Sequence, residues 1–428
     1  MSTTTFPRES RLGVLRQRDF ALLMAATVFQ NLVMPMQFIT LTFWSIDNYP
    51  GEKVLFSGLI VAVRGVGMLI FSLLGGAIAD RFERRHVLLV CELIAFTTTA
   101  LMAVCMIWKP FDDATIAALL VLVFLAASNM AIDGPSRSAS IPVIVGPARI
   151  GHAIALNNVA QQLTFPLVLP LVGWLSGTIG PGKVVAGSLL AWAFILPLIA
   201  MMRYSSKAMA MRRSSSGFVR DIRDGLGYAR RDATIFAVIA MIVAMQVVAM
   251  PGVGMLGPVW MTEVLGLSRG QFGLLAMLWG IGAVTSSLTF AARPEMGRRG
   301  TTLAAMVILF AVSGILFAHS RSVPLTAFAN FGLGFAMTGA IVTAMTLVQY
   351  TVSEQMRGRV MGLFPLVMGF SMLAVAPVSF AGQGLGLEVV VPATEWAALG
   401  IAGLILLGAP ALRRGKAGRV EATTAKPA

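Results

Sequence analysis

A few charged side chains lie inside or beside long apolar runs of the sequence, where a charge could do chemistry. Arg64 lies near the middle of one run, and Glu92 and Asp133 lie in or at the border of two others. An unpaired arginine at that depth in a membrane costs at least about 2.5 kcal/mol. Arg64 should therefore pair with a carbonyl, a polar cavity or an anionic group of a substrate. Glu92 and Asp133 are candidates for a proton relay.

Glu92 has a second interpretation. Arg84 and Arg85 precede it by about two helical turns, so the carboxylate could simply balance one of these charges. The sequence favours this balancing role over the relay.

Uncharged amide side chains also occur where hydrocarbon would reject them. Intramembrane polar residues often contact substrates, but single Asn and Gln residues also serve only to join helices by hydrogen bonds. Each amide by itself leaves both roles open. The candidates are Gln30, Asn31, Asn129, Gln246 and Asn330.

The sequence offers no recognisable enzyme or metal chemistry. Cys91 and Cys105 are 14 residues apart in one apolar run, which is about 21 Å along a helix, so they cannot form a disulfide with each other. The three histidines fall at predicted helix ends, and no metal-ligand spacing or catalytic triad is present. We therefore expect neither an enzyme nor a cofactor.

The elements that position these side chains follow from composition. Of the 428 residues, 57% are hydrophobic and 12% charged, whereas soluble domains are about 25% charged. The apolar residues gather in twelve runs near the length of about 20 residues that spans a bilayer. The sequence thus predicts an all-α integral membrane protein with twelve transmembrane helices. The runs are 20–46, 54–79, 87–107, 115–132, 154–179, 184–202, 233–261, 272–292, 301–318, 323–348, 360–380 and 393–412.

The net charge of +14 is a topology signal. When the connections are assigned alternately to two sides, 27 of the 33 Lys and Arg residues fall on the side that carries both termini. Positive residues stay cytoplasmic during insertion. We therefore expect a multi-pass protein of the cell inner membrane with both termini in the cytoplasm, and no nucleic-acid partner.

The chain divides into two halves around a polar stretch. We expect a cytoplasmic tail (1–18), a six-helix bundle (19–203), a cytoplasmic linker (204–232), a second six-helix bundle (233–413) and a tail (414–428). Within the linker, Phe218, Ile222 and Leu226 recur every four residues. This spacing is typical of an amphipathic helix on the membrane surface, although a solvated basic linker is about equally consistent. A weak repeat between 145–156 and 352–363 suggests pseudo-two-fold symmetry.

The connection between the second and third runs reads Gly76-Ala-Ile-Ala-Asp80-Arg81-Phe-Glu-Arg84-Arg85. It resembles the signature loop of the major facilitator superfamily, with a glycine, an Asp-Arg pair and then a basic pair. The resemblance implies that Gly76, Asp80, Arg81, Arg84 and Arg85 form a latch between the two halves at the cytoplasmic face. An acidic side chain there can face the partial positive charge of a helix N-terminus.

Weaker resemblances point to the drug and siderophore exporter branch that includes the enterobactin exporter. They comprise Arg18-Asp19-Phe20, Asp133-Gly-Pro-Ser-Arg137 after the fourth run, Ala155-Leu156-Asn157, and Arg357-Gly358-Arg359-Val360. In this superfamily the first, fourth, seventh and tenth helices line the cavity. The resemblance therefore favours Gln30, Asn31, Asn129, Gln246 and Asn330 as substrate contacts, with Arg64 beside them.

The resulting prediction is a secondary active transporter that works by alternating access. It would move a small amphipathic drug, siderophore or metabolite outward, as a monomer in the lipid bilayer, with H+ as a possible coupling ion. Related exporters often carry an acid in the first helix, where this chain has Gln30 and Asn31; this departure argues against proton coupling at that position. The alternatives are an importer of the same fold or, less favoured, a channel or a non-transporting membrane protein.

Overall fold

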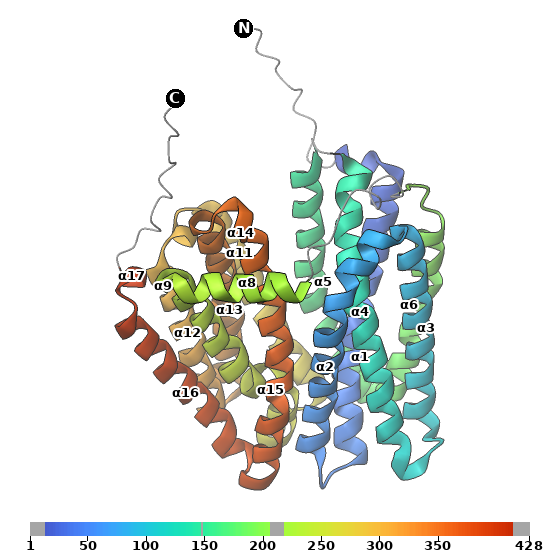
Figure 1. Ribbon diagram of the computed structural model, residues 1–428. Helices are drawn as coiled ribbons and strands as arrows, with labels where there is room; N and C mark the ends of the chain where they lie inside the picture. Colours follow the sequence, from blue (N-terminus) through green and yellow to red (C-terminus); the bar gives the residue numbers. More distant parts are fainter. Residues whose placement is uncertain (1–12, 147–148, 206–217, 414–428) are drawn as a thin grey trace, which may run out of the picture.

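The computed structural model describes residues 13–146, 149–205 and 218–413, and every regular element within these ranges is helical (Figure 1). The first half contains η1 (Gly13–Arg16), α1 (Arg18–Asn48), α2 (Lys53–Arg81), α3 (Arg84–Trp108), η2 (Asp112–Ala114), α4 (Thr115–Val145), α5 (Ile150–Thr178) and α6 (Pro181–Ala200).

The second half follows the linker helix α8 (Phe218–Arg231). It contains α9 (Ala233–Val243), η4 (Ala244–Ala249), η5 (Pro251–Met255), α10 (Gly257–Val259), η6 (Trp260–Val264), α11 (Arg269–Ala292), η7 (Met296–Arg298), α12 (Gly300–His319), α13 (Val323–Thr351), α14 (Glu354–Met361), α15 (Leu363–Leu385), α16 (Leu387–Gly408) and α17 (Pro410–Arg413).

These helices account for the apolar runs. Within the described residues, 10 helices are long and apolar enough to cross a membrane, or 11 if the bent pair Ile222–Arg231 and Ala233–Ala249 is counted as one span. The side chains described in α5 add a shorter apolar helix, Pro166–Thr178. Nine of the twelve predicted runs overlap one helix each; 360–380 overlaps α14 and α15, 393–412 overlaps α16 and α17, and 233–261 overlaps the chain from α9 to η6.

The helices pack in two groups that meet along two seams. In the first group α2 packs on α4, α3 on α4 and α6, and α1 on α5 and α6; in the second, α13 packs on α11 and α12, and α12 on α16. The seams are α2 against α15 and α5 against α11. Glycine permits the close approach at the second seam, because a Cβ on Gly273 would lie 2.6 Å from the carbonyl oxygen of Leu169.

We call the end of the molecule where α2 meets α3 the basic end, because most Lys and Arg residues lie in its connections. The opposite end, where α1 meets α2, is the far end; it lies at the bottom of Figure 1.

The fourth span differs from the prediction. Sequence reasoning ends it at residue 132 because Asp133, Pro135, Arg137 and Pro142 look like a polar connection, but α4 continues as one helix to Val145. Asp133 and Arg137 are therefore one helical turn apart and buried. The charges are tolerated inside the protein because each has partners there, as described below. Arg137 is therefore a buried cation inside a span, as Arg64 is.

The seventh span is an irregular helix. Between α9 and α11 the chain forms three π-helical segments, η4, η5 and η6. Such segments often occur at functional sites. Two prolines, Pro251 and Pro258, lie in this stretch, and a proline cannot donate the regular helical hydrogen bond.

The linker contains the amphipathic helix that the sequence predicts. Helix α8 runs crosswise to the spans in Figure 1 and packs against α14. Asp224 forms an ion pair of 3.1 Å with Arg359 of α14, and a Cβ on Gly225 would lie 2.7 Å from the Arg359 carbonyl oxygen. This face of α8 therefore covers the second half, while the side chains of 218–221 lie outside the described residues.

Candidate functional site

Contacts at the far end join the two halves. The Arg269 guanidinium of α11 pairs with Asp47 of α1, and the Lys53 ammonium of α2 pairs with Glu263 of η6. The Gln383 side chain of α15 also donates to the Gly51 carbonyl at 2.6 Å. All of these side chains keep part of their surface in solvent or are fully exposed. The two bundles are thus fastened here by polar contacts.

Arg269 is the centre of this far-end closure. Its guanidinium donates to the Ser176 carbonyl of α5 at 3.0 Å and lies 5.0 Å from the centre of the Phe43 ring of α1. The local sequence fixes its position, because Ser268 and Gln271 form a reciprocal capping box at the start of α11. One residue of the second half therefore contacts two helices of the first.

A buried network of charged and polar side chains lies inside the first half. The Arg137 guanidinium pairs with Glu92 of α3 and, at 3.2 Å, with Asp133 on its own helix. It also donates to the Thr27 hydroxyl of α1 at 3.1 Å, and the Gln30 amide donates to Asp133 at 3.1 Å. The network thus links α1, α3 and α4.

This network corrects one interpretation of Glu92. The carboxylate pairs with Arg137 of a neighbouring helix and not with Arg84 or Arg85. Arg84 donates to the Ala139 carbonyl of α4 at 2.7 Å, and Arg85 donates to the Ala200 carbonyl of α6 at 2.8 Å. Two turns of helix separate Glu92 from these arginines, whereas Arg137 approaches it from the side.

The network places two carboxyl groups against one guanidinium. One oxygen of Glu92, Oε2, is buried and accepts no hydrogen bond from the described residues. With all three groups ionised, the site would carry an uncompensated negative charge inside the protein, which is costly. The network therefore holds one more acidic group than basic groups.

The residues of the predicted latch lie at the basic end. Asp80 and Arg81 belong to the last turn of α2, not to a loop. The side chains of Gly76, Asp80 and Arg81 lie outside the described residues. The described hydrogen bonds of Arg84 and Arg85 are made within the first half, so the latch stays a prediction.

A further hydrogen bond lies beside this network, at the basic end. Ser140, one turn beyond Arg137 on α4, is 2.6 Å from the Tyr204 hydroxyl after α6. Burial raises the pKa of Tyr204, so its phenol stays protonated at neutral pH. The contact ties the end of α6 to α4.

The predicted substrate amides fall in different places. Gln30 belongs to the charge network, and Asn129 donates to the Cys91 carbonyl of α3 at 2.8 Å, which favours a packing role. Asn330 is buried and donates to Thr326 of its own helix at 2.9 Å. Asn31 Nδ2, Asn129 Oδ1 and Gln246 Oε1 are buried without a hydrogen-bond partner among the described residues.

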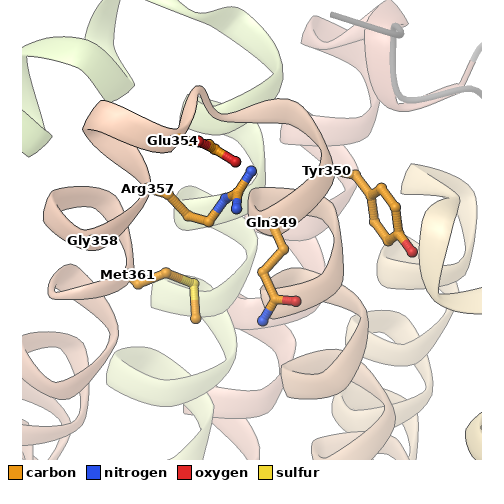
Figure 2. Close-up of a pocket in the computed structure, with 6 residues that line it drawn as sticks. All are labelled: Gln349, Tyr350, Glu354, Arg357, Gly358 and Met361. Atoms are coloured by element: carbon orange, nitrogen blue, oxygen red, sulfur yellow. The ribbon is translucent and has the colours of Figure 1, made fainter. Parts of the chain in front are cut away.

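A pocket of about 710 Å³ opens at the basic end of the second half. It is lined by Gln349, Tyr350, Glu354, Arg357, Gly358 and Met361. In Figure 2 the Arg357 side chain reaches toward Glu354 and Gln349, whereas Tyr350 turns away from them. The sequence segment Arg357–Val360 is marked by its resemblance to exporters, but nothing in it predicts a pocket.

Sequence reasoning misses two residues of this candidate site. Arg137 is assigned to a connection, although its spacing of four residues from Asp133 would place the two on one helix face. Arg269 looks like one of a few positive residues on the far side, and no local pattern distinguishes it from Lys183. The roles of Arg137 and Arg269 are revealed only by the side chains and carbonyl groups that they contact in the structure.

Comparison with known proteins identifies a matching family. The Major Facilitator Superfamily model matches residues 20–377. The chain is 25% identical over 347 residues to the multidrug efflux pump Tap of Mycolicibacterium fortuitum, covering 80% of this chain and 82% of that protein. It is also 25% identical over 310 residues to the uncharacterized MFS-type transporter YceJ of Bacillus subtilis (strain 168), covering 72% and 75%.

Solved transporter structures share the fold. The structure of the nucleoside transporter NupG superposes with a TM-score of 0.72 at 14% identity, covering 92% of this chain and 98% of that one. A POT family transporter in complex with 5-aminolevulinic acid gives 0.68 at 13% identity, covering 92% and 97%. At such identities the likeness concerns the fold alone, and it confirms the all-helical, multi-span fold predicted from the sequence.

Proposed function

Since the chain belongs to the Major Facilitator Superfamily, we propose that this secondary transporter exports a small amphipathic compound across the bacterial inner membrane in exchange for protons. The similarity to a multidrug efflux pump over most of the chain supports export. The observation that carries the coupling to protons is the buried network in which Glu92 and Asp133 share Arg137.

The network couples protonation to helix position. With one proton on the carboxyl pair, the charges of the three groups balance. Loss of that proton strengthens the pull of both carboxylates on Arg137, and the Gln30 amide transmits a change at Asp133 to α1. In the Major Facilitator Superfamily the first and fourth helices line the transport cavity. The proton site formed by Glu92 and Asp133 would then lie next to the substrate path.

Alternating access requires that the far-end closure can open. Asp47–Arg269 and Lys53–Glu263 are partly exposed ion pairs, and such pairs contribute about 0–1 kcal/mol each. Two of them bias the equilibrium between conformations without locking it. The latch of Gly76, Asp80, Arg81, Arg84 and Arg85 would fasten the basic end in the alternate state.

The charge distribution supports the orientation of the protein. The basic end would face the cytoplasm, with both termini inside, and the conformation described here would then be closed toward the outside. The division into bundles at 19–203 and 233–413, joined by the linker 204–232, supplies the two bodies that rock. Gln30, Asn31, Gln246 and Asn330 would line the path between them.

The proposal is tested by transport with the purified protein in liposomes. An acid-inside pH gradient should drive accumulation of a fluorescent amphipath, using dyes of negative, zero and positive charge. Nigericin, which collapses the gradient, should abolish the accumulation. Glu92→Gln should lose the response to the gradient while still equilibrating dye, because Asp133 and Arg137 then balance without a proton.

The alternative function has a distinct outcome. Accumulation driven by an alkaline-inside gradient would identify a proton-coupled importer and overturn export. Dye movement that ignores the gradient equally in the parent and in Glu92→Gln would overturn proton coupling.

A further inference from the structure

Arg64 is a buried cation with no acidic partner among the described residues. The residue is 9% exposed, and among the residues that the structure describes no carboxylate forms an ion pair with it. Its Nε is buried and makes no hydrogen bond within the described ranges. The guanidinium carbon lies 5.2 Å from the centre of the Phe38 ring of α1. The charge is therefore held against an aromatic face, with no counter-charge supplied by the described part of the chain.

The position of Arg64 is at the seam between the two halves. It follows the far-end residue Lys53 by 11 residues on α2, or about 16 Å along the helix axis, which is near the middle of a membrane. Its neighbour Gly65 contacts α15 so closely that a Cβ would lie 2.8 Å from the Met372 Cβ. On the same turn of α15, Ser371 bonds to the Gln246 carbonyl of η4.

Two other buried polar groups have no hydrogen-bond partner among the described residues, one on α1, which carries Phe38, and one on η4, which contacts α15. Asn31 precedes Phe38 by seven residues on α1, so the two side chains share a helix face, and Asn31 Nδ2 makes no hydrogen bond to the described residues. Gln246 Oε1 is likewise buried without a partner there. Arg64 and Asn31 both offer N–H donors, and the Gln246 amide can present either of its ends.

These groups together match one kind of ligand. An arginine that stacks on an aromatic ring still has its N–H groups free in the guanidinium plane, where they can bind a carboxylate with two parallel hydrogen bonds. Phe38, Met68 and Met372, which belong to one hydrophobic cluster, provide an apolar wall beside it. The pairing of a charged donor with such a wall suits an amphipath with an anionic end.

We propose that Arg64 binds the anionic headgroup of the transported compound, a carboxylate or a similar oxyanion on an apolar body, with the headgroup held between α1, α2 and the turn of α15 that contacts η4. This inference rests on the proposed function as a transporter of small amphipaths and names the chemical class of its cargo. Binding of the anion supplies the missing counter-charge at the seam, so occupancy and the packing of the two halves are linked.

The test compares two probes that differ only in charge. Dansylglycine carries a carboxylate, and dansylglycinamide replaces it by a neutral amide on the same fluorescent body. Each is titrated into the full-length protein in nanodiscs of phosphatidylcholine, and dansyl fluorescence reports binding. We expect the parent protein to bind dansylglycine at least tenfold more tightly than the amide.

Variants assign that preference to Arg64. Arg64→Gln should remove the preference, and Arg64→Lys should keep part of it because the charge remains while the planar fork is lost. Arg321→Gln is the matched control, because Arg321 also lies over an aromatic ring, that of Trp260, but at the exposed far end and paired with Glu388. It should keep the full preference.

Each outcome decides the proposal. A parent protein without preference for the carboxylate, or an Arg64→Gln variant that keeps the preference, overturns it; if Arg64→Gln does not fold, an undiminished preference in Arg64→Lys counts against the bidentate contact. Phosphatidylglycerol that competes with dansylglycine in the parent but not in Arg64→Gln would assign the site to a lipid headgroup. Because the readout is binding, failure of proton-driven transport would refute the proposed function without touching this result.

Discussion

Removing Arg137 from the buried network should destabilise the protein much more than removing Glu92. Arg137→Gln leaves two carboxyl groups buried without their cation, and loss of one partner of a buried pair costs about 3–5 kcal/mol. Glu92→Gln leaves Asp133 and Arg137 as a balanced pair, and it also removes the unpartnered Oε2 charge. That change should cost no more than about 1 kcal/mol.

The chain contains its own reporters for this measurement. Cys91 and Cys105 are free and buried in α3, and Cys91 directly precedes Glu92 in the sequence. A maleimide dye that becomes fluorescent on thiol reaction would therefore report thermal opening of α3 in detergent. The unfolding midpoint should fall steeply in Arg137→Gln and stay near that of the parent in Glu92→Gln.

A double variant separates charge balance from simple packing. Glu92→Gln combined with Arg137→Gln removes one negative and one positive charge, so its midpoint should lie above that of Arg137→Gln alone. Asp133→Asn should also stay near the parent, because Glu92 and Arg137 remain a balanced pair and the Asn carbonyl can still accept a hydrogen bond from Gln30. The reasoning fails if Arg137→Gln melts with the parent, or if Glu92→Gln is as damaging as Arg137→Gln.

Three further predictions concern the far-end closure, the latch and the seam between α5 and α11. Val61 of α2 is buried. In a Val61→Cys background, Arg269→Ala should raise several-fold the rate at which a membrane-impermeant maleimide on the far side labels the new thiol, because the far-end closure loosens; Lys183→Ala should leave that rate unchanged. Asp80→Asn should reduce transport at least tenfold with normal membrane insertion, and unchanged flux would remove the latch hypothesis. Gly273→Leu should lower the unfolding midpoint, because the added side chain meets the α5 backbone at the seam and overpacking costs about 1–3 kcal/mol; a parent-like midpoint would show that the seam can yield.

Local features of the sequence determined the helical, multi-span fold and the family. Each apolar run can be recognised from its own residues, because a helix must be apolar over about 20 consecutive residues to span the hydrocarbon core. The runs recur as helices in the structure. The motif from Gly76 to Arg85 and the distribution of positive residues are equally local. The amphipathic period of the linker also indicated the helix α8, one of the two interpretations that the sequence left open.

Only the tertiary structure decided which charges meet. Glu92 pairs with Arg137, 45 residues away, rather than with the arginines two turns before it, because a neighbouring helix offers its side chain at the same depth. The same holds for Arg269, whose partners Asp47 and Ser176 come from two helices of the other half. A partner across a helix interface depends on how two helices rotate and approach, and the sequence of either helix alone does not contain that angle.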